Sequence, residues 1–261
     1  AEPWQIRAYA KAGDVSLDLR ASKIRYSNDN ALMVRVASTG VKVDPVTLKA
    51  EGGSTLDLCG TMAFDGALAF ETSGRFGTEI VRPVRALRDA FSRVDGAIEI
   101  GAAPTARGPN SCLPLSKKHV LFIGGTRKHP ALTGRLVTRG LTMIPRGLGR
   151  MVTVDDDSSI TFLPGDLPGR QLIKFPKDER FSGTYDEGSF QVLGDIELMN
   201  FGLQSVQLNV VGTDITHASG GEYTMTFNPD LWITVTDFSN ERMRRMTLAG
   251  EVEVTDGTYY K

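Results

Sequence analysis

The stretch Met246–Tyr260 reads M-T-L-A-G-E-V-E-V-T-D-G-T-Y-Y, and the rest of the chain is interpreted from it. Apolar or small residues occupy every second position, namely Met246, Leu248, Gly250, Val252 and Val254. The positions between them are Thr247, Ala249, Glu251, Glu253 and Thr255. Because successive side chains of a strand point to opposite faces, this pattern predicts a β-strand with one apolar and one polar face.

The end of this stretch predicts an exposed sheet edge. Asp256-Gly257 is typical of a turn, and Thr258–Tyr260 would then begin a new strand that stops at Lys261. The strand before the turn would have only a short partner on its outer side, which indicates a fragment of a longer chain. Since an unpaired edge with an apolar face favours pairing with another strand, we expect edge-to-edge self-association of this fragment.

The same alternation recurs along the whole chain. Examples are Val15–Ala21, Leu32–Val36, Phe190–Leu198, Val206–Val210, Tyr223–Phe227 and Leu231–Val235, with Asn228-Pro229-Asp230 expected to turn between the last two. Such short segments, separated by turn residues, predict an all-β fold. With no linker-like change of composition, residues 1–261 are expected to form one β domain with a helical and loop insertion at about 83–112. A two-sheet sandwich, a barrel or an open trough would each bury the apolar faces.

One segment departs from the strand pattern. In Pro83–Val94 the apolar residues Val84, Leu87, Ala90, Phe91 and Val94 fall at three- and four-residue spacing. Pro83 suits a first helical turn, and Asp95-Gly96 a stop. This segment is predicted to be one short amphipathic helix, and Ala102–Asn110 a polar loop.

Composition excludes several classes of function. Thirty basic and 31 acidic residues give a net charge of −1, which does not favour nucleic-acid binding. The three histidines share no metal-ligand spacing, Gly124–Lys128 lacks the spacing of a phosphate-binding loop, and Asp155–Asp157 lacks the frame of a calcium loop. No nucleophile motif such as G-x-S-x-G is present. We therefore predict a non-catalytic protein without metal or cofactor.

Cys59 and Cys112 are the only cysteines, 53 positions apart. In an oxidising compartment a disulfide between them would stabilise the fold by roughly 3–4 kcal/mol. Two unrelated buried thiols fit the sequence as well, because spacing alone does not bring two cysteines together.

Several segments resemble TamB-type translocation and assembly module proteins of the AsmA-like superfamily. Leu248–Tyr260 is similar to the family's recurrent L-x-G-E-V-x-V-x-x-G-x-Y segment. Val46–Thr61 and Ala131–Gly147 resemble its glycine-punctuated leucine strands, and Ser189–Leu198 and Tyr223–Thr234 resemble its strands that are followed by P-D-L-x-I. The helix-like Pro83–Val94 and the loop Ala102–Asn110 depart from the family's regular strands.

The resemblance implies a periplasmic C-terminal fragment of a chain anchored in the inner membrane of a Gram-negative bacterium. The implied fold is a long curved sheet folded into an open, taco-like trough with an apolar interior. Some twenty strands about 4.8 Å apart would make it on the order of 100 Å long. The implied role is to carry phospholipid acyl chains between the two membranes and to support outer-membrane protein assembly, with an outer-membrane barrel protein as partner through a further C-terminal segment.

The residues expected to line the trough share the apolar parity of their strands. They are Leu17, Leu19, Val34, Val36, Leu48, Leu58, Val192, Ile196, Leu198, Leu208, Val210, Met225, Phe227, Ile233, Val235, Leu248, Val252 and Val254. Each buried methylene contributes about 0.8 kcal/mol, so binding is expected to follow contact length rather than head group. The alternative is a closed β-sandwich that serves as a scaffold or adhesion domain.

Overall fold

The computed structural model describes residues 6–10, 26–29, 31–50, 53–77, 91–102, 111–114, 116–146, 149–178, 180–200, 202–219, 223–236 and 245–259. Within these ranges the chain is all-β and contains no helix. The strands of its first half are β1 (Ile6–Ala10), β2 (Tyr26–Asn28), β3 (Leu32–Ala37), β4 (Gly40–Ala50), β5 (Thr55–Ala63), β6 (Leu68–Gly77), β7 (Phe91–Ile100), β8 (Leu121–Gly125) and β9 (Pro130–Pro145). Those of its second half are β10 (Val152–Val154), β11 (Ser159–Pro164), β12 (Arg170–Phe175), β13 (Phe181–Tyr185), β14 (Gly188–Met199), β15 (Gly202–Thr213), β16 (Ile215–Ser219), β17 (Tyr223–Thr236) and β18 (Arg245–Tyr259).

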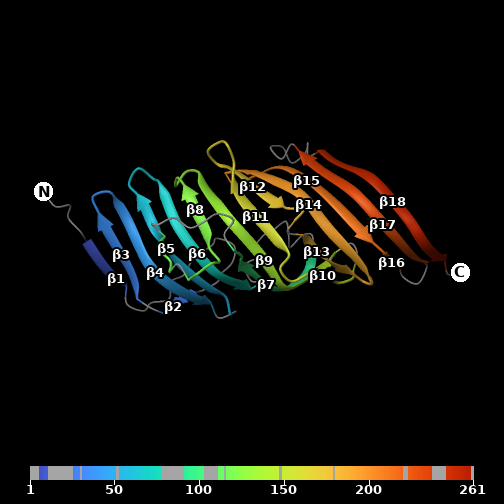
Figure 1. The fold of residues 1–261 in the computed structure, drawn as a ribbon, viewed down its shortest axis with the longest axis horizontal. Helices are drawn as coiled ribbons and strands as arrows, with labels where there is room; N and C mark the ends of the chain where they lie inside the picture. The colour runs from blue at the N-terminus through green and yellow to red at the C-terminus, as the bar shows by residue number, and fades with distance from the viewer. Residues whose placement is uncertain are drawn as a thin grey trace.

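All eighteen described strands belong to one antiparallel sheet, which runs from β1 at one end to β18 at the other (Figure 1). Five positions in this sheet hold two strands end to end: β2 with β3, β7 with β8, β10 with β11, β12 with β13, and β15 with β16. In Figure 1, β7, β10 and β16 lie toward one long edge, and β8 and β15 toward the other. The eighteen strands therefore fill thirteen positions.

This arrangement corrects the expected length. At about 4.8 Å a position, the described sheet is roughly 60 Å long rather than 100 Å, because several short segments share a position instead of each adding one. A line through the five interruptions divides the sheet lengthwise into two walls, and we call it the fold line.

Continuous strands cross the fold line by local irregularities. β4 has a register shift between Val43 and Val46, and β9 carries Gly140 with φ 56°. Gly194 of β14 has φ 118°, and a Cβ there would lie 2.1 Å from the backbone oxygen of Gln207. Only glycine tolerates that conformation and approach, so β14 bends where β12 ends and β13 begins.

Two expected turns are strand in the structure. Asn228-Pro229-Asp230 lies inside β17, where Pro229 faces the interruption between β15 and β16 and its missing N–H removes no bond to either. Asp256-Gly257 lies inside β18, because a bulge at the neighbouring register shift lets Thr258 and Tyr259 continue pairing with β17. The prediction of a turn and a new strand there is wrong.

The expected helix is wrong wherever it can be examined. Phe91–Val94 belongs to β7, while Pro83–Ala90 lies outside the described residues, as does most of the loop Ala102–Asn110. The register of β7 with β9 shifts between Phe91 and Arg93, where β7 holds the extra residue, and between Asp95 and Ala97, where β9 holds it. The first shift places Phe91 and Val94, three residues apart, on the same face of β7, which is the helix-like spacing within the described residues.

Cys59 and Cys112 form a disulfide with 6.0 Å between their Cα atoms. It holds the segment 111–120 against β5, β6 and β8, where Leu113 and Val120 are buried beside Cys59. The buried carboxylate of Glu71 accepts hydrogen bonds from the Leu113 N–H (3.1 Å) and from the Ser111 hydroxyl (2.7 Å). We call segment 111–120 the strap.

The strap is also fixed by an ion pair, because Lys117 Nζ lies 2.8 Å from Asp57 Oδ2. Burial raises the pKa of Asp57, but hydrogen bonds from Lys117 and Thr47 outweigh it, and the pKa is lowered overall. Asp57 therefore favours the folded state above its ordinary pKa of 3.8, and this contribution is lost as the pH falls through the lower folded-state value.

Removing the disulfide is expected to destabilise the sheet through the strap. Cys59→Ser/Cys112→Ser should lower the free energy of unfolding by about 3–4 kcal/mol, because it frees a 53-residue loop in the unfolded chain. Chemical denaturation measures this, and a reductant should shift the wild-type midpoint but not that of the double variant. An unchanged wild-type midpoint after verified reduction would contradict the prediction.

Candidate functional site

One face of the sheet collects the apolar side chains. Residues directly opposite each other in an antiparallel pair point to the same side, so the register can be followed from strand to strand. Across the C-terminal half, Ile196 pairs with Val206, Val206 with Val235, and Val235 with Met246. The N-terminal half continues the same face through Val34, Val43 and Val46 with their apolar partners. The prediction of a single apolar face is confirmed for the described strands, and we call it the inner face.

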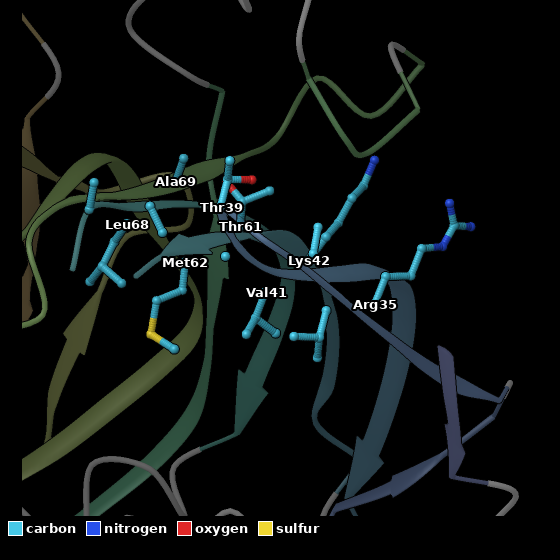
Figure 2. A pocket seen from close by; sticks show the side chains of 13 residues that line it. Arg35, Thr39, Val41, Lys42, Thr61, Met62, Leu68 and Ala69 are labelled. Atoms are coloured by element: carbon cyan, nitrogen blue, oxygen red, sulfur yellow. The ribbon is translucent and has the colours of Figure 1, made fainter. Parts of the chain in front are cut away.

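Figure 2 shows this separation near the N-terminal end. Val41 and Met62 project to one side of the sheet, while Arg35 and Lys42 project to the other. Arg35 and Lys42 pair directly across β3 and β4, and Arg35 also forms an ion pair with Asp44 at 2.6 Å. A cavity of about 490 Å³ at this place is lined from both faces, so its lining is mixed in polarity.

The middle of the inner face is closed. Ile100 and Val154 are each 1% exposed, and Leu141 is 6% exposed. Ile100 pairs with Leu136, and Val154 pairs with Gly183. Leu141 lies two residues before Met143 on β9, so all three are at inner-face positions. These side chains are therefore withdrawn from solvent in the middle of the described sheet.

A buried glutamine completes the hydrogen bonding there. Gln171 is 2% exposed, and its side-chain oxygen accepts the Leu132 N–H at 2.7 Å. Its side-chain nitrogen donates to the carbonyl oxygens of Leu132 (3.0 Å) and Leu163 (2.6 Å). The side chain thus replaces a strand residue where β11 ends at Pro164, which has no N–H to offer.

Toward the C-terminal half, the inner face opens into a cavity of about 500 Å³, which we call the inner cavity. Its lining is Phe91, Met143, Val152, Phe181, Tyr185, Phe190, Val192, Val210, Ile215, His217, Phe227 and Pro229. These residues come from β7, β9, β10 and β13 to β17, so seven successive positions of the sheet enclose one space. That requires a concave inner face.

The inner cavity offers hydrocarbon and aromatic surface. Its two polar side chains face each other, with the Tyr185 hydroxyl 3.4 Å from His217 Nδ1. Burial raises the pKa of Tyr185 above its ordinary value of 10.0, against an opposing effect of Arg150. Apart from this pair the lining is hydrocarbon and aromatic, which suits a flexible apolar ligand.

The predicted lining residues separate into groups. Val192, Val210 and Phe227 line the inner cavity, and Val36 lines the cavity of Figure 2. Leu48 and Leu58 belong to a closed cluster around Val46, with Leu48 only 3% exposed. Inner-face positions beside or beyond the inner cavity hold Val34, Ile196, Leu198, Leu208, Ile233 and Val235.

The remaining predicted residues are either exposed on the inner face or outside the described ranges. Met225, Leu248, Val252 and Val254 are on the inner face but largely exposed, at 36%, 57%, 51% and 54%. Leu17 and Leu19 lie outside the described residues. Leu48 keeps its inner-face position, but it packs within the Val46 cluster rather than against the inner cavity.

Most of the aromatic lining is not predicted by the strand alternation in the sequence. Phe91 was assigned to a helix and Pro229 to a turn, while Phe181 and Tyr185 belong to a strand of only five residues. Phe190 and Val152 did show the correct alternation in sequence. His217 could have been found only through Asp214, whose φ of 53° shifts the parity between β15 and β16.

The other candidate sites carry structural contacts. Asp155, Asp156 and Asp157 accept from the Ser182 hydroxyl, the Gly140 N–H and the Arg139 guanidinium, respectively. Each carboxylate is used by a different neighbour, so they do not converge on one point.

A sulfur and carboxylate cluster is also engaged. Cys59, Glu71 and Cys112 place their ligand atoms within 4.8 Å of one another, but both sulfurs are in the disulfide. The described residues contain no helix that is long and apolar enough to cross a membrane. Comparison of the chain with family models, curated proteins and solved structures finds no match in any of the three.

The raised pKa of Tyr185 should make the stability of the protein depend on pH. Because its folded-state pKa is raised, its contribution is complete below pH 10 and is lost as the pH rises through the folded-state value. Tyr185→Phe should make the thermal unfolding midpoint less dependent on pH above 10. Phenolate absorbance of both proteins during alkaline titration measures this, and identical titration curves would show that Tyr185 ionises like an exposed tyrosine.

Proposed function

We propose that this chain binds the acyl chains of phospholipids on its inner face, with the inner cavity as the principal contact site. The observation that carries the proposal is a predominantly apolar cavity lining that spans several strands. Acyl chains need contact area and no fixed hydrogen bonds, and each methylene they bury contributes about 0.8 kcal/mol.

The dimensions of the inner cavity suit one acyl chain. Its lining extends from β7 to β17 through β9, β10, β13, β14 and β16. Six intervals of about 4.8 Å give a path of roughly 29 Å across these strands. A lipid chain that spans one leaflet covers about 15 Å, half of a hydrocarbon core of about 30 Å. The path therefore accommodates a lipid chain lying across the strands.

We further propose the wider role implied by the resemblance to TamB-type proteins. In that role the chain is a non-catalytic periplasmic conduit between the inner and outer membranes and supports outer-membrane protein assembly with a barrel protein as partner. The disulfide between Cys59 and Cys112 supports an oxidising compartment such as the periplasm. The resemblance supports the role as a periplasmic conduit, and the apolar inner cavity supports the binding of acyl chains.

The alternative is a scaffold or adhesion domain built as a closed β-sandwich. A sandwich needs two sheets with dry inner faces, whereas the described strands form one sheet with an apolar cavity. The lipid proposal is favoured for that reason, and the two proposals differ in whether lipid accompanies the protein.

The first test uses neighbouring residues on opposite faces of β17. Ile233 pairs with Leu208 and Leu248 on the inner face, while Thr234 lies between Gln207 and Thr247 on the outer face. Ile233→Asp should remove most co-purifying phospholipid, because a carboxylate in an acyl path is costly to desolvate. Thr234→Asp should retain the wild-type amount, as measured by mass spectrometry of extracted lipids.

Circular dichroism melts complete that test. Both variants should stay folded, since a trough leaves water access to the new carboxylate at position 233. Collapse of Ile233→Asp alone, with no lipid in the wild-type protein, would favour the dry sandwich core.

A second test fills the inner cavity without adding charge. Val192→Trp should reduce binding of a fluorescent phospholipid several-fold, because the larger ring occupies space that the acyl chain needs. Leu193→Trp is the matched control, since Leu193 pairs with Asn209 on the outer face. Equal losses in both variants would place the acyl chain elsewhere.

A further inference from the structure

Among the described strands, β18 is paired along one edge only. It pairs along its whole length with β17, and no other strand within the described ranges pairs with it. Its inner-face side chains are well exposed, with Met246 at 69%, Leu248 at 57% and Val252 at 51%. A strand edge of this kind presents unpaired backbone N–H and C=O groups, which another strand can satisfy.

We propose that β18 pairs antiparallel with β18 of a second copy of this chain, with the two-fold axis at Ala249. A two-fold axis at one residue places equal surfaces against each other, which is the commonest closed symmetry of dimers. The proposal concerns assembly and stands independently of lipid binding.

Side-chain parity restricts the registers that are open to this pairing. The inner faces of the two copies join only when even-numbered residues oppose even-numbered ones, since a shift by one residue moves every side chain to the other face. For a symmetric pair this means that a residue, and not a peptide bond, lies on the axis.

Charge selects among the remaining registers. An axis at Glu251 would place this carboxylate against its own copy, and an axis at Val252 would place Glu251 against Glu253 twice. Like charges directly opposite each other destabilise a strand pair. An axis at Gly250 places two glycines at the centre and leaves the two Glu251 side chains on a diagonal, so it is also less favourable.

The axis at Ala249 avoids all of these conflicts. Arg245 then lies opposite Glu253 of the second copy, and on the diagonal from its Glu251. Arg245 forms no ion pair with any residue that the structure describes, and Glu251 is likewise available, while Glu253 accepts a bond from Asn228. On the inner face, Met246 meets Val252.

Pairing in this register would make one continuous apolar surface from two inner faces. Met246 and Val252 of each copy would cover part of each other, which removes apolar area from water. Side-chain burial would therefore stabilise the dimer in addition to the backbone hydrogen bonds.

Charge exchange tests the register. Sedimentation velocity of the full chain over a concentration series should show a monomer–dimer equilibrium. Arg245→Glu and Glu253→Arg should each raise the dissociation constant about tenfold or more, because two attractive pairs become repulsive. Arg245→Glu/Glu253→Arg should restore dimerisation, whereas Arg127→Glu at the distant β8–β9 turn should have no effect.

Cross-linking tests the axis. Ala249→Cys should form an intermolecular disulfide on mild oxidation, because the two Cβ atoms at the axis lie opposite each other. Thr247→Cys on the same face should not, since its own copy lies four residues along the partner strand. A monomer at every concentration, no rescue by the double variant, or cross-linking through position 247 would each overturn the proposal.

Discussion

The structure depends on the two-residue period of the extended chain carried through an unbroken series of antiparallel pairs. Each pair transmits side-chain direction to the next strand, so a choice of face in β3 determines the choice in β18. Hydrophobic burial then acts on one surface of the whole sheet rather than on separate cores. The three apolar clusters around Val46, Cys59 and Val152 show how this surface is divided, with the Cys59 cluster alone on the outer face under the strap.

The fold line turns this flat surface into a site. Interruptions at five positions, and bends such as the one at Gly194, let the sheet curve without losing its pairing. Where the two walls approach each other, buried side chains such as Val154 form a core. Where the walls are farther apart, the space between them is the inner cavity. Outer-face ion pairs, including Arg139 with Glu99 at 3.0 Å and Arg170 with Glu197 at 2.8 Å, tie neighbouring strands together on the wet side.

Sequence reasoning succeeded where parity is uninterrupted. Val192, Val210 and Phe227 were placed on the inner face because their strands alternate regularly, and the all-β class followed from the same signal. It failed in two places: a bulge in β7 puts Phe91 and Val94 at helix-like spacing, and Asn228-Pro229-Asp230 has the composition of a turn although it continues β17 in register. The division of the inner face into closed and open parts depends on how far the sheet curves, which no local pattern encodes. Pairing of Cys59 with Cys112 likewise required the course of the strap over β5.

The closed middle of the inner face has a kinetic consequence. A ligand bound in the inner cavity can reach the N-terminal half only if the packing of Ile100, Leu141 and Val154 opens. Affinity for the cavity and speed of passage are therefore separate properties, the first governed by contact area and the second by how often the walls separate. A conduit of this design would act as a series of compartments with gates between them, and its throughput would respond to temperature and to mutations in the closed packing while its equilibrium binding stayed the same.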